Sequence, residues 1–183
     1  MNTAHAMPGS ETDAARLPGV RTPPVAVIGV GNTLMGDDGV GIDILESLSR
    51  DEVGDDVELV HGGTAGMALM RYFLECELVI VLDGIDAAAE PGEVFRFHPD
   101  AAGVTGLRSN NIHGMGVGYL LTSARLRGIA PRVVVLAVQV GDVRPHDRRL
   151  TPPVAAAAAR VRELVIEEVR LWRRKYQQTA LNS

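Results

Sequence analysis

The segment Val25-Ala26-Val27-Ile28-Gly29 decides the fold class of this chain. It is a continuous apolar run that stops at a glycine, and such runs are typical of strands buried on both faces of a parallel sheet. Leu78-Val79-Ile80-Val81-Leu82 has the same character, as does the run over residues 132–138. Shorter strand patterns occur at residues 57–60 and 94–97, and the alternation in the second of these indicates an edge strand.

Helical patterns lie between these strands. Apolar residues recur at three- and four-residue steps over residues 39–50, 66–75 and 114–127, and again from Pro152 onward. Strands that alternate with helices predict an α/β fold, specifically an α/β/α sandwich with a mostly parallel sheet. The polar, glycine-containing stretch 99–112 is predicted to be a loop, and its length is typical of functional loops.

Length and composition restrict the class of protein further. The chain has 183 residues, of which 46% are hydrophobic, and this suits one globular domain with a full core, here expected over residues 24–176. Residues 1–23 are predicted to be a disordered N-terminal extension and residues 177–183 a flexible tail. The net charge of −5 argues against nucleic acid as a partner.

The cellular setting is inferred from what the sequence lacks. A single cysteine, Cys76, excludes an internal disulfide framework and indicates a reducing compartment. No apolar stretch is long enough for membrane insertion, and the first twenty-odd residues lack the features of a secretory signal. We therefore expect a cytoplasmic protein. A monomer is favoured, although the sequence leaves the oligomeric state undecided.

Four polar residues follow strands of the predicted sheet. Asp37 and Asp38 come after the first strand, Asp83 closes the strand at residues 78–82, and His113 opens a helix. Ligand sites of such folds lie beyond the carboxyl ends of the strands. Two carboxylates and an imidazole delivered there can converge on one divalent metal ion.

Each of these residues also has a purely structural interpretation. Asp38 can cap the helix that follows it, a contribution of about 1 kcal/mol, and His113 can do the same for its own helix. Asp83 precedes a glycine, so it can form an Asx turn. From the residues alone, neither interpretation excludes the other.

A glycine pattern after the first strand raises the question of nucleotide binding. Gly29-Val30-Gly31-Asn32-Thr33-Leu34 begins like a dinucleotide fingerprint, but Leu34 stands where a third glycine or alanine is required. Asp37 and Asp38 would also repel a pyrophosphate. The residues thus argue against a nucleotide or other organic cofactor, and the glycines permit a tight turn instead.

Taken in order, these segments resemble the maturation endopeptidases of nickel–iron hydrogenases. The most specific segment spans residues 29–41, GVGNTLMGDDGVG. Support comes from Gly62-Gly63-Thr64-Ala65-Gly66, from Val81-Leu82-Asp83-Gly84, from His113, and from Leu150-Thr151-Pro152. The resemblance extends over about residues 25–172.

The resemblance implies a fold and a function. The fold is a three-layer α/β/α sandwich of the phosphorylase/hydrolase-like type, with a mixed, mostly parallel five-stranded sheet. The family removes a short C-terminal extension from the hydrogenase large-subunit precursor, its partner, after nickel has been inserted. Its metal-binding residues match Asp38, Asp83 and His113 here, and some members carry a longer glutamate at the position of Asp38.

The resemblance also suggests how the site is used. Ni²⁺ would arrive with the precursor, and Asp38, Asp83 and His113 would contact it. Asn32, Asp37 and Thr64 are expected to support the site or to touch the substrate backbone. Whether the metal or an aspartate activates water stays open. The alternatives are a nickel-dependent chaperone that does not cleave and, from the glycine pattern, a nucleotide-binding module.

Overall fold

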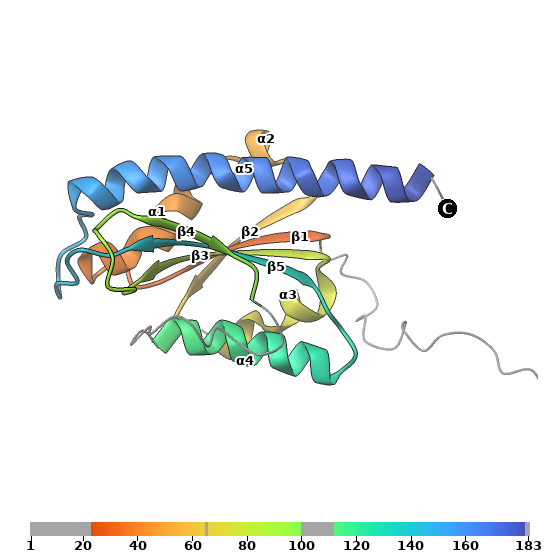
Figure 1. The fold of residues 1–183 in the computed structure, drawn as a ribbon, viewed down its shortest axis with the longest axis horizontal. Coiled ribbons are helices and arrows are strands. Elements are labelled where there is room, and N and C mark those ends of the chain that lie inside the picture. Colours follow the sequence, from red (N-terminus) through yellow and green to blue (C-terminus); the bar gives the residue numbers. More distant parts are fainter. Residues whose placement is uncertain (1–22, 65, 100–111, 182–183) are drawn as a thin grey trace, which may run out of the picture.

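Five strands form a twisted sheet in the order β2-β1-β3-β5-β4 (Figure 1). They are β1 (Val25–Val30), β2 (Val57–Gly63), β3 (Leu78–Ile85), β4 (Val94–Phe97) and β5 (Arg132–Gln139). β1 is parallel to β2 and β3, and β3 is parallel to β5, whereas β4 is antiparallel to β5. The mixed, mostly parallel sheet is confirmed, and so is the edge position of β4.

Helices cover both faces of the sheet. They are α1 (Val40–Ser47), α2 (Arg50–Val53), α3 (Met70–Glu75), α4 (Ile112–Leu126) and α5 (Pro152–Leu181), with 3₁₀ turns η1 (Gly36–Gly39) and η2 (Gly66–Leu69). Figure 1 shows α1, α2 and α5 on one face and α3 and α4 on the other. The predicted three-layer α/β/α sandwich is therefore confirmed.

The structure is a computed structural model and describes residues 23–64, 66–99 and 112–181. Side chains are described for these residues except 112–118 and 179–181. The N-terminal extension expected over residues 1–23 thus lies almost wholly outside the described residues, as does most of the loop expected at 99–112. None of the helices in the described part is long and apolar enough to cross a membrane.

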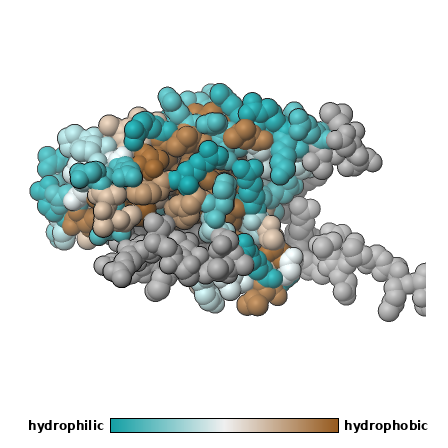
Figure 2. Space-filling view, in the orientation of Figure 1, coloured by the Kyte–Doolittle hydropathy of each residue, from teal (hydrophilic) through white to brown (hydrophobic). Residues whose placement is uncertain are grey.

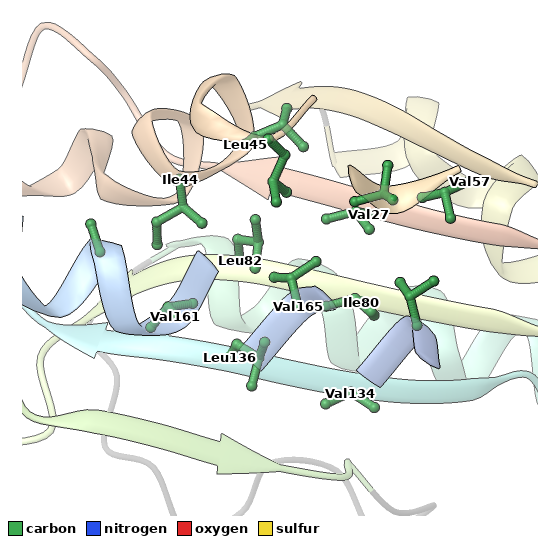
Figure 3. Packing of buried hydrophobic residues seen from close by; sticks show 14 of the residues in the cluster. Val27, Ile44, Leu45, Val57, Ile80, Leu82, Val134, Leu136, Val161 and Val165 are labelled. Carbon is green, nitrogen blue, oxygen red and sulfur yellow. The ribbon is translucent and has the colours of Figure 1, made fainter. Parts of the chain in front are cut away.

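Two apolar clusters hold the layers together, one on each side of the sheet. Successive side chains of a strand point to opposite faces, so Val25 and Val27 join the cluster under α1 and α5, whereas Ala26 and Ile28 join the cluster over α3 and α4. All of these strand positions are fully buried. Figure 3 shows the first cluster, in which Ile44 packs close to the sheet. This two-sided burial explains why the strands read as continuous apolar runs.

The terminal helix α5 lies along the sheet with one apolar side. Val161, Val165 and Val169 are buried in the first cluster, and the outer surface along α5 in Figure 2 is mainly hydrophilic. The helix continues to Leu181, past the expected boundary at residue 176. The Tyr176 ring stacks on Trp172 with centroids 5.3 Å apart, which extends side-chain packing into the last turns.

Helix boundaries differ most from expectation after β1. The helix predicted over residues 39–50 is η1 followed by α1, which ends at Ser47, and by the separate short helix α2. Ser49 forms a capping box with Glu52, so it begins a new helix rather than continuing the first. The helix predicted over 66–75 is likewise divided into η2 and α3.

α1 packs so closely on the sheet that one position needs a glycine. A Cβ atom on Gly41 would lie 2.3 Å from the carbonyl oxygens of both Leu82 and Val30. Because these oxygens belong to the backbone of β3 and β1, a side chain at position 41 could fit only if α1 moved away from the sheet.

Gly41→Ala is therefore expected to lower the free energy of unfolding by about 2 kcal/mol. Gly66→Ala is the matched control, since no atom of the described residues lies within 4 Å of its Cβ position, and its effect should stay within about 0.5 kcal/mol. Urea unfolding of both variants measures the difference. Equal stabilities for the two variants would contradict the close packing.

Candidate functional site

Asp38 lies in the loop that leaves the carboxyl end of β1. The loop folds back sharply at Gly31, whose φ is +125°, and a Cβ atom there would meet the Asp38 carbonyl oxygen. The backbone N–H of Asn32 donates a hydrogen bond to Asp38 Oδ2 over 3.0 Å. α1 has Gly39 at its N-cap and no side-chain cap. The capping interpretation of Asp38 is thus wrong, and its half-buried carboxylate belongs to the loop.

Asp37 has a different environment from its neighbour. Its side chain is fully buried, and Oδ2 accepts hydrogen bonds from the backbone N–H groups of Gly141 and Asp142 over 2.9 Å each. Thr151 donates its N–H to Oδ1 over 2.6 Å and its hydroxyl to Oδ2 over 2.9 Å. Asp37 therefore joins the β1 loop to the loop after β5 and to the start of α5. These bonds fix the position of the loop that also carries Asp38.

Asp83 lies inside β3, because the strand continues to Ile85 instead of ending at Leu82 as expected. Its backbone pairs with Ala137 of β5, so the Asx-turn interpretation is wrong. The residue is only 3% exposed. Burial, and next the negative charge of Asp38, raise the pKa of the Asp83 carboxyl to about 8, while a hydrogen bond from the Gly84 backbone acts in the opposite direction.

The electrostatic coupling between Asp38 and Asp83 is the main feature of the site. The carboxylate of Asp38, in the loop after β1, adds to burial in disfavouring charge on Asp83 of β3. A bound cation would remove this repulsion and stabilise both charged forms. The donor set therefore suits a positively charged group.

The raised pKa of Asp83 predicts how stability depends on pH in metal-free protein. The folded state holds this proton up to about pH 8, whereas the unfolded chain releases it near pH 4. The stabilisation is therefore fully present below about pH 4 and is lost as pH rises to about 8. Asp83→Asn, which has no such proton to lose, should be the more stable protein at pH 9, by an amount on the order of a few kcal/mol.

Urea unfolding of both proteins between about pH 5 and pH 9 in the presence of a chelator measures this difference. The two stability curves should diverge as pH rises. Parallel curves would show that Asp83 titrates normally in the folded protein.

His113 lies in the first turn of α4, because that helix begins at Ile112. It was expected just before the helix, and its side chain lies outside the described residues. Among the described side chains, no group of three or more histidine, cysteine, aspartate or glutamate residues is placed to hold a metal. The structure thus brings together Asp38 and Asp83 and leaves the third predicted ligand untested.

The two other predicted residues lie beside the same loop. Asn32 and Thr64 both line an open pocket of about 610 Å³ next to the β1 loop. Asn32 is half-buried, and its side-chain oxygen accepts the Leu34 N–H over 3.0 Å. Sequence reasoning missed the charged members of this pocket, which are Asp43, Glu46, His61 and Arg148. Only the three-residue step between Asp43 and Glu46 on one helix hinted at them.

Comparison with known proteins matches the chain to one family. A family model described as hydrogenase maturation protease matches residues 42–168, a range that contains Asp83 and His113 and begins just after Asp38. The hydrogenase expression/formation protein HupD of Bradyrhizobium diazoefficiens is 32% identical, with 81% of this chain and 79% of that protein covered. The hydrogenase 2 maturation protease of Escherichia coli K12 is 31% identical, with 80% and 90% covered.

Solved structures show the same relationship. The hydrogenase maturating endopeptidase HybD from E. coli superimposes with a TM-score of 0.71 at 29% identity, over 80% of this chain and 91% of that one. The α/β fold is therefore shared with a hydrogenase maturating endopeptidase. On this evidence the chain belongs to the hydrogenase maturation protease family.

Proposed function

We propose that this protein is an endopeptidase that removes the C-terminal extension of a nickel–iron hydrogenase large-subunit precursor after nickel insertion. Asp38, Asp83 and His113 recognise the nickel that the precursor carries. The observation that supports this most directly is the raised pKa of the Asp83 carboxyl, which results first from burial and next from the negative charge of Asp38. Such a pair is unfavourable alone and favourable around a cation.

The chemistry of the donors fits a borderline divalent ion. Two carboxylate oxygens and one imidazole nitrogen suit Ni²⁺, and they leave coordination positions for the ligands that the precursor supplies. Recognition of a metal through an incomplete ligand set would restrict cutting to precursor that already contains nickel. In this proposal nickel is part of the substrate.

The residues of this chain have separate tasks in the proposed reaction. Asp38 and Asp83 hold the nickel centre and thereby place the scissile peptide bond at the carboxyl edge of the sheet. Asp37 fixes the loop that carries Asp38 through its bonds to Thr151 and to Gly141. The nickel ion, when bound, supplies Lewis acidity close to the peptide carbonyl.

The proposal is tested by mixing the protein with nickel-loaded and nickel-free precursor and measuring the mass of the large subunit. Loss of a C-terminal peptide from the loaded form alone is the expected result. Stable binding of the loaded form without any loss of mass would identify a chaperone instead. Equal cleavage of both forms would contradict nickel recognition.

A further inference from the structure

The pocket beside the β1 loop lies next to the proposed nickel site without including its carboxylates. Its lining combines the β1 loop, α1, the end of β2 and residues near the start of α5. Asn32 connects the two regions, because it lines the pocket and its N–H binds the Asp38 carboxylate. A polypeptide held at Asp38 and Asp83 can therefore continue into this pocket.

One wall of the pocket is acidic. Asp43 and Glu46 lie three positions apart on α1, so their side chains are neighbours on the helix surface. Partial burial, and next the charge of Glu46, raise the pKa of Asp43. The imidazole of His61 lies close to this wall, with its Nε2 4.0 Å from Glu46 Oε1. This wall carries negative charge that no Arg or Lys of the described chain neutralises by an ion pair.

A lone arginine supplies positive charge at the same pocket. Arg144 and Arg149 form ion pairs with Asp142 and Asp147 in the loop after β5. Arg148 lines the pocket. Across the described part of the chain it has no ion pair within 4.0 Å, with Asp43 and Glu46 or with any other acid.

We propose that this pocket is the groove that binds the polypeptide segment around the scissile bond. A basic side chain of that segment lies at Asp43 and Glu46, and a carboxylate, from a side chain or the chain terminus, lies at Arg148. The inference rests on the proposed function, since it takes the substrate to be a polypeptide. The acidic wall and Arg148 lie at different places on the groove. The groove therefore selects a segment that carries its basic and its acidic group in a fixed order along the chain.

The charge pattern disfavours other occupants. A nucleotide or phosphate would be repelled by the acidic wall. A metal ion would need three or more suitable ligands, and the described side chains offer no such group. A polypeptide can satisfy both walls and can also contact Gly31 and Gly63, which line the pocket.

The test uses amide chemical shifts of the full-length protein with capped amino acids as probes. N-acetyl-arginine amide should shift the signals of Ile42–Glu46, and its uncharged analogue N-acetyl-citrulline amide should bind about fivefold more weakly. N-acetyl-glutamate amide should shift residues 148–150, with N-acetyl-glutamine amide as its control. Equal shifts with charged and uncharged probes would overturn the assignment.

Variants separate the two walls. The double variant Asp43→Asn/Glu46→Gln should lose the response to the arginine probe and keep the response to the glutamate probe. Arg148→Gln should do the opposite. Glu163→Gln, on the exposed side of α5, is the matched control and should change neither response. Loss of both responses in either variant would contradict two independent walls.

Cleavage kinetics then connect the groove with the reaction. Both groove variants should raise KM for the loaded precursor about fivefold and leave kcat within about twofold. Unchanged KM with normal cleavage would overturn the groove and leave the proposed function standing. Probe binding without any cleavage by the wild-type protein would support the groove and contradict the proposed function.

Discussion

Replacing Asp38 or Asp83 with asparagine is expected to abolish cleavage of the nickel-loaded precursor. Each change keeps the shape of the side chain and removes one negative charge from the proposed donor set. Since loss of residues that merely support a metal ligand costs 10–100-fold, loss of a ligand should reduce kcat/KM by about 100-fold or more. His113→Ala should have the same effect if its imidazole is the third donor.

The control for this experiment is Asp55→Asn. Asp55 is exposed and lies just before β2, at the edge of the sheet opposite the site. This variant should cleave at the wild-type rate, and all variants should unfold cooperatively. If Asp38→Asn and Asp83→Asn still cut the precursor within about twofold of wild type, the pair has no part in the reaction.

Removal of the Asp37 carboxylate is expected to give a large loss of stability. Asp37→Ala deletes four hydrogen bonds and leaves three backbone N–H groups, those of Gly141, Asp142 and Thr151, without this acceptor. Each unsatisfied buried donor costs about 1–3 kcal/mol, so the free energy of unfolding should fall by about 4 kcal/mol. Urea unfolding of the purified variant measures it.

Thr151→Val is the matched control for Asp37. It removes only the hydroxyl bond to Oδ2 and keeps the backbone N–H bond to Oδ1. Its expected cost is about 1 kcal/mol. If Asp37→Ala costs less than about 1 kcal/mol, the β1 loop, the loop after β5 and the start of α5 hold together without the carboxylate.

The fold was predictable because its decisive signal is local. Strands buried on both faces must be apolar at every position, and β1, β3 and β5 show this directly in the sequence. Element boundaries were less accurate. The end of β3 was placed before Asp83, since a buried acid normally marks the end of an apolar strand.

The positions of the candidate acids after β1 were predictable, but their environments were not. Asp37 and Asp38 are adjacent acids in the sequence, yet one is fully buried and the other faces the site. The difference depends on Thr151 and on the loop after β5, more than a hundred positions away, which no local pattern reveals. Long-range contacts of this kind decide which acid holds the structure and which one is left for the proposed metal contact.

Glu168 shows the same limit on α5. Acidic side chains are rarely fully buried, but Glu168 is only 1% exposed and pairs with Arg96 of β4 and Arg132 of β5. Burial of such an acid depends on two strands that lie next to each other only in the folded sheet. The charged pocket at Asp43 and Arg148 escaped prediction for the same reason.

The most direct test of the account is the affinity of the protein for nickel-loaded and nickel-free precursor, measured at equilibrium. Wild type should bind the loaded form at least about tenfold more tightly, and Asp38→Asn/Asp83→Asn should bind both forms equally, with Asp55→Asn unchanged from wild type. Equal affinity of wild type for the two forms would show that these carboxylates do not recognise the metal.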